Sequence, residues 1–374
     1  MQKKCWKKVI MKNKQSNAII VGDKKTPETS RELELLLNTL HINTEVVFPI
    51  DTSKIHPATF LTKGKLEELL LLSQALQVDF IAFDDELGYT QIRNLSKKFS
   101  SIITDRPRII LDIFSSRATS REGKIQVQLA VLKKRLPEIV QQHQSYDQQV
   151  GFIGGKGPGE RKIEITRRNI YQKIHRLNLQ LKGLEKQRKT KRDRRLSSNQ
   201  FLVSIVGYTN AGKSTLFNAL TKDQTPTDDL LFHTLDTRTR KGFLSNSLGY
   251  ALYSDTVGFI RKLPHELVEA FKGTLEEIRY ADLLLIVVDV SDPDFPLHLN
   301  TVKDTLLDLQ AQHIRQIIVY NKADLYPEQT NFNALMKQYG DGILVSALKK
   351  GNIDSLKKEI IFQIESSLSS FNEA

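Results

Sequence analysis

The chain has 374 residues, enough for roughly two or three domains that each bury a hydrophobic core. Its single cysteine, Cys5, excludes an internal disulfide and a cysteine-based zinc site and predicts a reducing, cytoplasmic setting. The formal net charge of +12 favours an acidic partner, most often nucleic acid, and no membrane span is predicted because no apolar run is long enough.

The first part of the chain, 18–106, alternates strand and helix patterns and follows a basic tail at 1–17. Strands are expected at 18–22, 44–50, 79–84 and 102–103, and helices at 29–40, 66–76 and 90–99. Alternation at this spacing indicates a small α/β domain with a parallel sheet.

The middle part, 107–196, predicts an antiparallel helical hairpin. Apolar residues recur every three or four positions over 126–140 and again over 160–195, which places each set on one face of a helix. Between them, the segment 151–159 contains five glycines and a proline and is expected to form a non-helical tip.

The second hairpin helix is strongly basic. Residues 160–195 include 14 Lys or Arg and four Asp or Glu, a net charge of +10. A charge run is often a solvated helix face or a linker. Because the charge is concentrated beside a glycine-rich tip, contact with nucleic-acid phosphates is the favoured interpretation.

The last part, 200–366, predicts a second α/β unit, followed by a tail at 367–374. Strands are expected at 201–206, 242–244, 251–254, 283–288, 317–320 and 342–345, with helices at 215–220 and 353–366 among the segments between and after them.

A phosphate-binding loop joins the first of these strands to a helix. The spacing G-x-x-x-x-G-K-[ST] is formed by Gly207, Tyr208, Thr209, Asn210, Ala211, Gly212, Lys213 and Ser214, with Thr215 after it. Its glycines let successive N–H groups point at a phosphate, where the helix N-terminus adds partial positive charge. Lys213 is expected to reach the β- and γ-phosphates as a catalytic group, and Ser214 to ligate Mg²⁺.

Two further segments are expected to complete the phosphate and magnesium site. The first is Asp255, Thr256, Val257 and Gly258, where Asp255 would hold Mg²⁺ through water and the Gly258 N–H would meet the γ-phosphate. The second is Phe232, His233, Thr234, Leu235 and Asp236, where Thr234 is the candidate for the second hydroxyl on Mg²⁺.

Two segments near the end of the chain select the base. Asp324 can accept two hydrogen bonds from the N1–H and N2–H₂ groups of guanine, a pair that adenine lacks, while Asn321 and Lys322 would brace that loop. The backbone of the segment Ser346, Ala347 and Leu348 could meet the guanine O6. Together the five patterns predict binding of GTP and GDP with Mg²⁺.

Several stretches resemble the HflX family of ribosome-associated GTPases, from about residue 18 to 366. They are the phosphate loop, the run 255–264 (DTVGFIRKLP), the run 110–114 (ILDIF) with 121–124 (REGK), and the tip 157–160 (GPGE). The resemblance implies an N-terminal α/β subdomain, a helical hairpin and a P-loop GTPase (Ras-like) G domain. It further implies a protein, expected to be a monomer, that binds the large ribosomal subunit and splits or rescues stalled ribosomes under stress.

The hairpin is similar to the part of such proteins that reaches ribosomal RNA, which makes Lys156, Arg161, Lys162, Arg167 and Arg168 the candidate RNA contacts. The chain departs from the family pattern in three places. The run 161–168 (RKIEITRR) replaces a Thr-Gln-Leu-Glu-x-Asp-Arg-Arg type run, and His233 and Thr237 stand where Ala and Pro are usual. The chain is also expected to lack a C-terminal domain that some members carry.

Two residues of the nucleotide site leave alternatives open. Phe259 stands where many GTPases carry a glutamine that orients the attacking water. It is either a packing residue or, as we favour, the sign of slow intrinsic hydrolysis that the ribosome stimulates. Asn210 resembles an asparagine that coordinates K⁺ in some related GTPases, and stabilisation of the loop's own backbone is an equal alternative.

Two other functions remain alternatives to ribosome splitting. One is a GTP-dependent factor for ribosome assembly or RNA remodelling. The other is a signalling GTPase with a protein partner, which the +10 charge of the hairpin helix disfavours.

Overall fold

The computed structural model describes residues 16–147, 158–197, 200–223, 231–232, 235, 237–263, 267, 271, 275–326 and 332–372. The chain divides into two compact units. The described residues of unit 1 lie within Met1–Ser116, Ile125–Gln180 and Lys262–Glu269, and those of unit 2 within Arg117–Lys124, Leu181–Arg261 and Ala270–Ala374.

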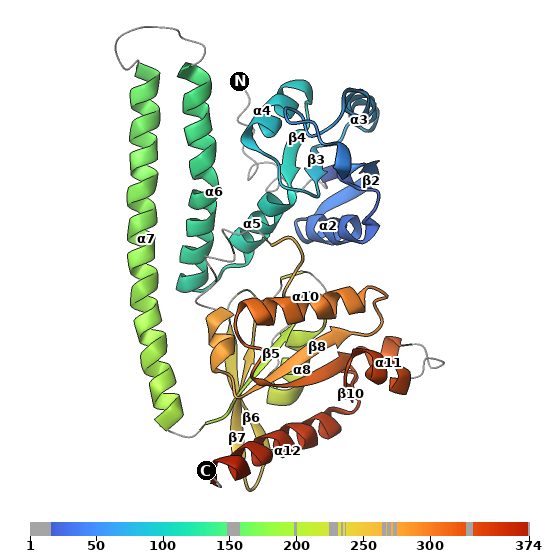
Figure 1. The fold of residues 1–374 in the computed structure, drawn as a ribbon, viewed down its shortest axis with the longest axis vertical. Helices are drawn as coiled ribbons and strands as arrows, with labels where there is room; N and C mark the ends of the chain where they lie inside the picture. Colours follow the sequence, from blue (N-terminus) through green and yellow to red (C-terminus); the bar gives the residue numbers. More distant parts are fainter. Residues whose placement is uncertain are drawn as a thin grey trace. The chain divides into compact units, whose positions relative to one another are not determined.

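Unit 1 contains a four-stranded parallel sheet, as expected (Figure 1). Its order is β2-β1-β3-β4, formed by β1 (Ser16–Asp23), β2 (Ile42–Ile50), β3 (Phe80–Phe83) and β4 (Ile102–Asp105). The connecting helices are α2 (Pro27–Thr39), α3 (Lys63–Leu76) and α4 (Tyr89–Lys98). The central strands β1 and β3 are almost wholly buried, which explains why their sequences are continuous apolar runs.

Helix α5 (Arg106–Arg117) was not expected as a helix, and it starts directly after β4. Its apolar residues Ile109, Ile110, Ile113 and Phe114 are at most 2% exposed. The first residue, Arg106, is fully buried, and its guanidinium donates to the carboxylates of Asp84 and Glu32 and to the carbonyl of Thr29. Helix α5 is therefore held to unit 1 by both apolar packing and a buried ion network.

The hairpin helices are α6 (Arg121–Asp147) and α7 (Pro158–Ser197), which run in opposite directions in Figure 1. The buried residues Leu129, Ile170 and Leu177 belong to the apolar stripes seen in the sequence. The expectation of a non-helical tip was wrong at Pro158 and Gly159, which begin α7. Proline suits a first helical turn because backbone N–H groups there have no partner within the helix, so no hydrogen bond is lost. The rest of the expected tip, 151–157, lies outside the described residues.

Unit 2 contains a six-stranded sheet in the order β10-β9-β8-β5-β7-β6. Its strands are β5 (Leu202–Gly207), β6 (Arg238–Ser245), β7 (Gly249–Asp255), β8 (Leu283–Asp289), β9 (Arg315–Asn321) and β10 (Gly342–Leu344). All neighbouring pairs are parallel except β6 with β7. The carboxyl ends of β5, β7, β8, β9 and β10 therefore meet at one edge of the sheet.

The helices of unit 2 include α8 (Lys213–Thr221), the 3₁₀ helix η2 (Glu276–Tyr280), α10 (Phe295–Asp308), α11 (Phe332–Tyr339) and α12 (Ile353–Asn372). Helix α12 is six residues longer than expected and takes in most of the predicted tail. Its residues Leu356, Ile360 and Ile364 recur every four positions and are buried against the sheet core. Across the described part of the chain, no helix combines the length and apolarity needed to cross a membrane.

Candidate nucleotide-binding site

The phosphate loop connects β5 to α8 and has the backbone that its glycines permit. Gly207 and Gly212 have φ angles of +156° and +87°. A Cβ atom at Gly207 would collide with the Val287 carbonyl oxygen, and one at Gly212 with the Asn321 side-chain amide. Positive φ and close neighbours together restrict both positions to glycine.

Lys213 begins α8 and lies inside the loop rather than in solvent. The residue is only 7% exposed, and its Nζ donates to the Tyr208 carbonyl oxygen at 2.6 Å. Burial lowers the pKa of Lys213 to about 8, although the nearby Asp255 carboxylate opposes the shift. The negative charge of a bound phosphate chain would stabilise the charged form of this ammonium group.

The two residues expected at the magnesium ion lie together. Ser214 Oγ donates to Asp255 Oδ2 at 2.7 Å, and Asp255 is the last residue of β7. A hydroxyl beside a carboxylate is the oxygen donor set that Mg²⁺ prefers, so these residues fit the ion. Thr234, the other candidate ligand, lies outside the described residues together with His233 and Asp236, while Phe232 and Leu235 are buried.

The segment after β7 is bonded to the phosphate loop. Thr209 N donates to the Phe259 carbonyl at 2.8 Å, and Phe259 N donates to the Gly207 carbonyl at 3.1 Å. A Cβ at Gly258 would lie 2.9 Å from Lys213 Nζ, so this glycine borders the phosphate position. The Phe259 residue is only 5% exposed, so it packs inside the fold and offers no group to orient water.

Asn321, at the end of β9, braces the base-binding side. Its Nδ2 donates to the Ala211 carbonyl at 2.9 Å, and its Oδ1 accepts from Ala347 N at 3.0 Å. The side chain thus ties the phosphate loop to the segment that follows β10. The N–H of Ser346 donates to the Gly351 carbonyl, so the N–H groups of Ser346 and Ala347 both hold this segment in shape.

Asp324 is held as a carboxylate. Ser346 Oγ donates to its Oδ1 at 2.5 Å, and this hydrogen bond is the main cause of its lowered pKa. Lys322 is turned toward β8, where its Nζ contacts Asp289 Oδ2 at 2.7 Å. Leu348 is 75% exposed beside them. An ionised Asp324 can accept the two hydrogen bonds that guanine donates.

The structure also shows a contact that the sequence did not suggest. The ring of His298, in α10, stacks on Tyr208 with centroids 3.9 Å apart and an interplanar angle of 11°. The Tyr208 hydroxyl accepts from Arg261 N at 3.0 Å, so the tyrosine links the phosphate loop to both α10 and the segment after Gly258. No spacing in the sequence connects residues 208 and 298.

The candidate RNA contacts are described only in part. Arg167 and Arg168 are exposed on α7, and the Arg167 guanidinium lies 5.9 Å from the Tyr171 ring centroid. Arg161 and Lys162 belong to the first turns of α7, but their side chains lie outside the described residues, as does the whole of Lys156.

Three protein-family models match consecutive parts of the chain. They are described as GTP-binding GTPase N-terminal, at residues 9–115, GTP-binding GTPase Middle Region, at 117–195, and 50S ribosome-binding GTPase, at 202–322.

The chain is also similar to curated proteins over most of its length. It is 44% identical to the GTPase HflX of Caldanaerobacter subterraneus subsp. tengcongensis, over 91% of this chain and 78% of that protein. It is 39% identical to the GTPase HflX of Flavobacterium psychrophilum, over 91% and 89%. For the GTPase HflX of Escherichia coli K12 the identity is 38%, over 80% and 70%.

Among solved structures, the crystal structure of SsGBP in complex with GDP matches with a TM-score of 0.52 at 23% identity, over 95% of this chain and 99% of that one. At this identity the likeness concerns the fold. The fold is α/β, with an N-terminal domain and a Ras-like P-loop GTPase domain, as the sequence predicted.

Proposed function

Because the chain belongs to the HflX family of GTPases, we propose that its GTP-bound form binds the large ribosomal subunit and splits or rescues stalled ribosomes under stress. The chain hydrolyses GTP, as its family and its GTPase domain indicate. One observation carries the proposal for the nucleotide site: Lys213 and Ser214, at the start of α8, lie at the same sheet edge as Asp255 of β7 and Asn321 of β9.

Each residue of the site has a proposed task. Lys213 binds the phosphate chain and stabilises charge on it, and the Gly258 N–H meets a γ-phosphate oxygen, which the closeness of Gly258 to Lys213 Nζ supports. Ser214 and Asp255 would hold Mg²⁺, which would neutralise negative charge on the phosphates. Asp324 selects guanine, with Asn321 fixing the loop around it.

Phe259 supports a role for the ribosome in hydrolysis. Its side chain is buried, and a phenyl ring cannot orient water, so the group that completes the catalytic site comes from outside the segment after Asp255. We expect slow turnover of GTP by the protein alone and acceleration by large ribosomal subunits. Fast turnover that is indifferent to ribosomes would contradict this part of the proposal.

Asn210 is the candidate for a potassium ion beside the phosphates. It is exposed in the loop with a φ angle of +61°. If K⁺ contributes, turnover in potassium buffer should exceed turnover in sodium buffer at the same ionic strength. Equal rates would leave Asn210 as a residue that stabilises its own loop.

Ribosome binding is supported by the family model for unit 2 and by the basic helix α7, on which Arg167 and Arg168 are exposed. The deciding experiment is a ribosome-dissociation assay with GTP, GDP and a non-hydrolysable GTP analogue. We expect intact ribosomes to decrease with GTP and with the analogue, but not with GDP. Unchanged ribosome profiles in all three would refute splitting.

Two further arms separate the alternatives. Co-sedimentation with mature and precursor large subunits tests the assembly factor, which would prefer precursors. Charge reversal by Arg167→Glu with Arg168→Glu should abolish co-sedimentation, and Lys97→Glu with Lys98→Glu, two exposed neighbours on α4, is the matched control. Binding that neither pair affects would favour a signalling GTPase with a protein partner.

A further inference from the structure

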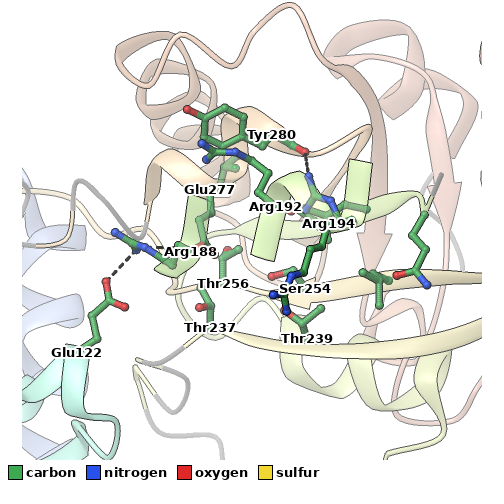
Figure 2. Close-up of a pocket in the computed structure, with 16 residues that line it drawn as sticks. Glu122, Arg188, Arg192, Arg194, Thr237, Thr239, Ser254, Thr256, Glu277 and Tyr280 are labelled. Carbon is green, nitrogen blue, oxygen red and sulfur yellow. Dashed lines mark hydrogen bonds and ion pairs between the residues drawn. The ribbon is translucent and has the colours of Figure 1, made fainter. Parts of the chain in front are cut away.

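Unit 2 contains a pocket that the nucleotide site does not use. Its volume is about 590 Å³, and its walls come from the C-terminal part of α7, from η2 and from one face of strands β5, β7 and β6 (Figure 2). Of the residues assigned above to GTP, only Thr256 also lines this pocket. Four arginines and five serine or threonine side chains are among its lining residues.

The floor of the pocket is a row of hydroxyls. Ser204 of β5 is paired with Ser254 of β7, which is paired with Thr239 of β6, so the three side chains lie on the same face of the sheet. Ser204 and Ser254 are only 2% and 7% exposed. Helix-covered sheet faces are normally apolar, and the opposite face here carries Val203 and Tyr253 in the main core. This face instead offers hydrogen-bonding groups at depth.

The arginines are held in place around this floor. The Arg192 guanidinium lies 3.8 Å from the Tyr280 ring centroid, and Arg195 Nη2 donates to the Tyr280 carbonyl at 2.8 Å. Arg188 lies between two carboxylates, with Nη1 2.8 Å from Glu122 and Nε 3.7 Å from Glu277. Figure 2 shows Arg192 and Arg194 above Ser254 and Thr239.

The balance of charge favours an anion. Four arginines face two glutamates, a net charge of +2 in the lining. Burial lowers the pKa of Arg195, despite the neighbouring Asp282 and Glu277 carboxylates, and burial raises the pKa of Glu277. A bound anion would stabilise the charged form of the buried Arg195 guanidinium, and a Glu277 side chain shifted toward its neutral form repels an anion less than an ionised one would.

We propose that this pocket binds the diphosphate or triphosphate group of a small ligand, at a site separate from that of GTP. Arginine forks and hydroxyl groups match the several acceptor oxygens of phosphate. The volume lies within the range of small-molecule pockets, roughly 300–1,000 Å³. A concave site with a hydroxyl floor suits a compact ligand, whereas an RNA backbone follows a surface groove.

Two residues that line the pocket, Thr237 and Thr256, lie close in sequence to the expected magnesium-binding residues. Thr256 follows Asp255 directly and donates its hydroxyl to the Ile205 carbonyl at 2.8 Å. Thr237 comes immediately after the segment that contains Thr234. A ligand in the pocket therefore contacts residues next to both expected magnesium-binding segments.

The test uses the full chain saturated with GDP, so that the phosphate loop is filled, and calorimetric titration with inorganic pyrophosphate. We expect saturable binding that Arg192→Gln weakens about tenfold or more, because a hydrogen bond to a charged group is removed. Lys182→Gln removes the same charge from an exposed position on the same helix and should leave binding unchanged.

A second variant guards against misfolding of the first. Ser254→Val keeps a strand-forming residue and the charge but replaces the floor hydroxyl, and should also weaken pyrophosphate binding. GDP affinity reports the integrity of each variant. ATP, which Asp324 disfavours at the guanine site, is titrated in parallel: equal affinity indicates recognition of the phosphate chain alone, and tighter binding indicates a nucleotide.

Three results would overturn the proposal. They are no binding of pyrophosphate or ATP, binding that neither pocket variant weakens, and binding of a single-stranded RNA oligonucleotide in place of both small ligands.

Discussion

Lys213 is an ammonium group buried in the loop that is proposed to bind the phosphate chain. In the protein without nucleotide its pKa is lowered to about 8 by burial, so the side chain is neutral at high pH. Bound phosphates restore the pKa because they stabilise the charged form. Nucleotide binding above pH 8 must therefore take up a proton.

This linkage predicts a loss of GDP affinity as the pH rises above about 8. With that pKa, Lys213 is about half protonated at pH 8 and about one-tenth protonated at pH 9, so the affinity should fall about fivefold between them. Calorimetry in two buffers of different ionisation enthalpy measures the proton uptake directly. Little uptake should be found at pH 7, and none at pH 9 would contradict the shift.

If Asp324 selects guanine as proposed, its substitution gives a gain as well as a loss. Asp324→Asn replaces an acceptor by an amide that can donate to the 2-keto group of xanthine. GTP affinity should fall about 100-fold or more, because one hydrogen bond from guanine is lost and the other no longer goes to a charged group. XTP affinity should rise, as measured by competition with a fluorescent nucleotide. Ser346→Ala, which removes the hydroxyl on Asp324 Oδ1, should weaken GTP binding without favouring XTP.

The buried ion network around Arg106 fixes the start of helix α5. Asp84 would have a raised pKa from burial alone, but the Arg106 and Lys262 charges lower it. The two cations Arg106 and Lys262 compensate the carboxylates of Asp84 and Glu32, so removing Arg106 leaves two buried carboxylates with one cation between them.

Arg106→Met should therefore destabilise the protein by about 3–5 kcal/mol, as measured by urea unfolding of unit 1. Arg108→Met, an exposed position on the same helix, should cost less than about 1 kcal/mol. Replacing all three charges by apolar residues of similar size should restore much of the stability. A destabilisation below about 1 kcal/mol for Arg106→Met would show that the network does not hold α5.

The elements that the sequence predicted are those with a regular apolar period. The parallel strands around Ile81 and Leu285 are continuous buried runs, and Asp255 is at the end of its strand, as expected. Helix α5 was missed because a run of apolar residues such as 109–111 fits a strand as well as a buried helix. Pro158 was misassigned because proline has two opposite effects. It breaks a helix when it lies in the interior, but it is favoured in the first turn.

The site shows the same limit at longer range. Motif spacing brought out Lys213, Asp255 and Asp324, because each lies at or shortly after the carboxyl end of a strand and these parallel strands end at one edge. The stacking of His298 on Tyr208 and the row formed by Ser204 with Ser254 depend on strand register and helix packing. Such contacts join residues with no common motif, so a single sequence does not reveal them.

For the whole molecule, the distribution of charge matters more than its total. Most of the net charge of +12 arises from the +10 of residues 160–195. If this helix neutralises RNA phosphates, binding to large subunits should weaken steeply with salt, because each neutralised phosphate releases counterions.

The logarithm of the binding constant should then fall linearly with the logarithm of the salt concentration. Arg167→Gln with Arg168→Gln should reduce the steepness by about two, roughly one for each phosphate that is no longer neutralised. Lys97→Gln with Lys98→Gln removes the same charge from α4 and should leave the slope unchanged. Equal slopes for all three proteins would place these arginines away from RNA.

Helix α7 contains a glycine close to the point where it passes from one unit to the other. Its 40 residues form a rod about 60 Å long, and it contributes Pro158–Gln180 to unit 1 and 181–197 to unit 2. Glycine inside a helix lowers the stability of the helix by up to about 1 kcal/mol relative to alanine. Gly183 lies just beyond the passage between the units, with open space where a side chain would be. The intrinsic stability of α7 as a helix is therefore lowest around Gly183, which makes this turn the first place inside the helix where its hydrogen bonds would open.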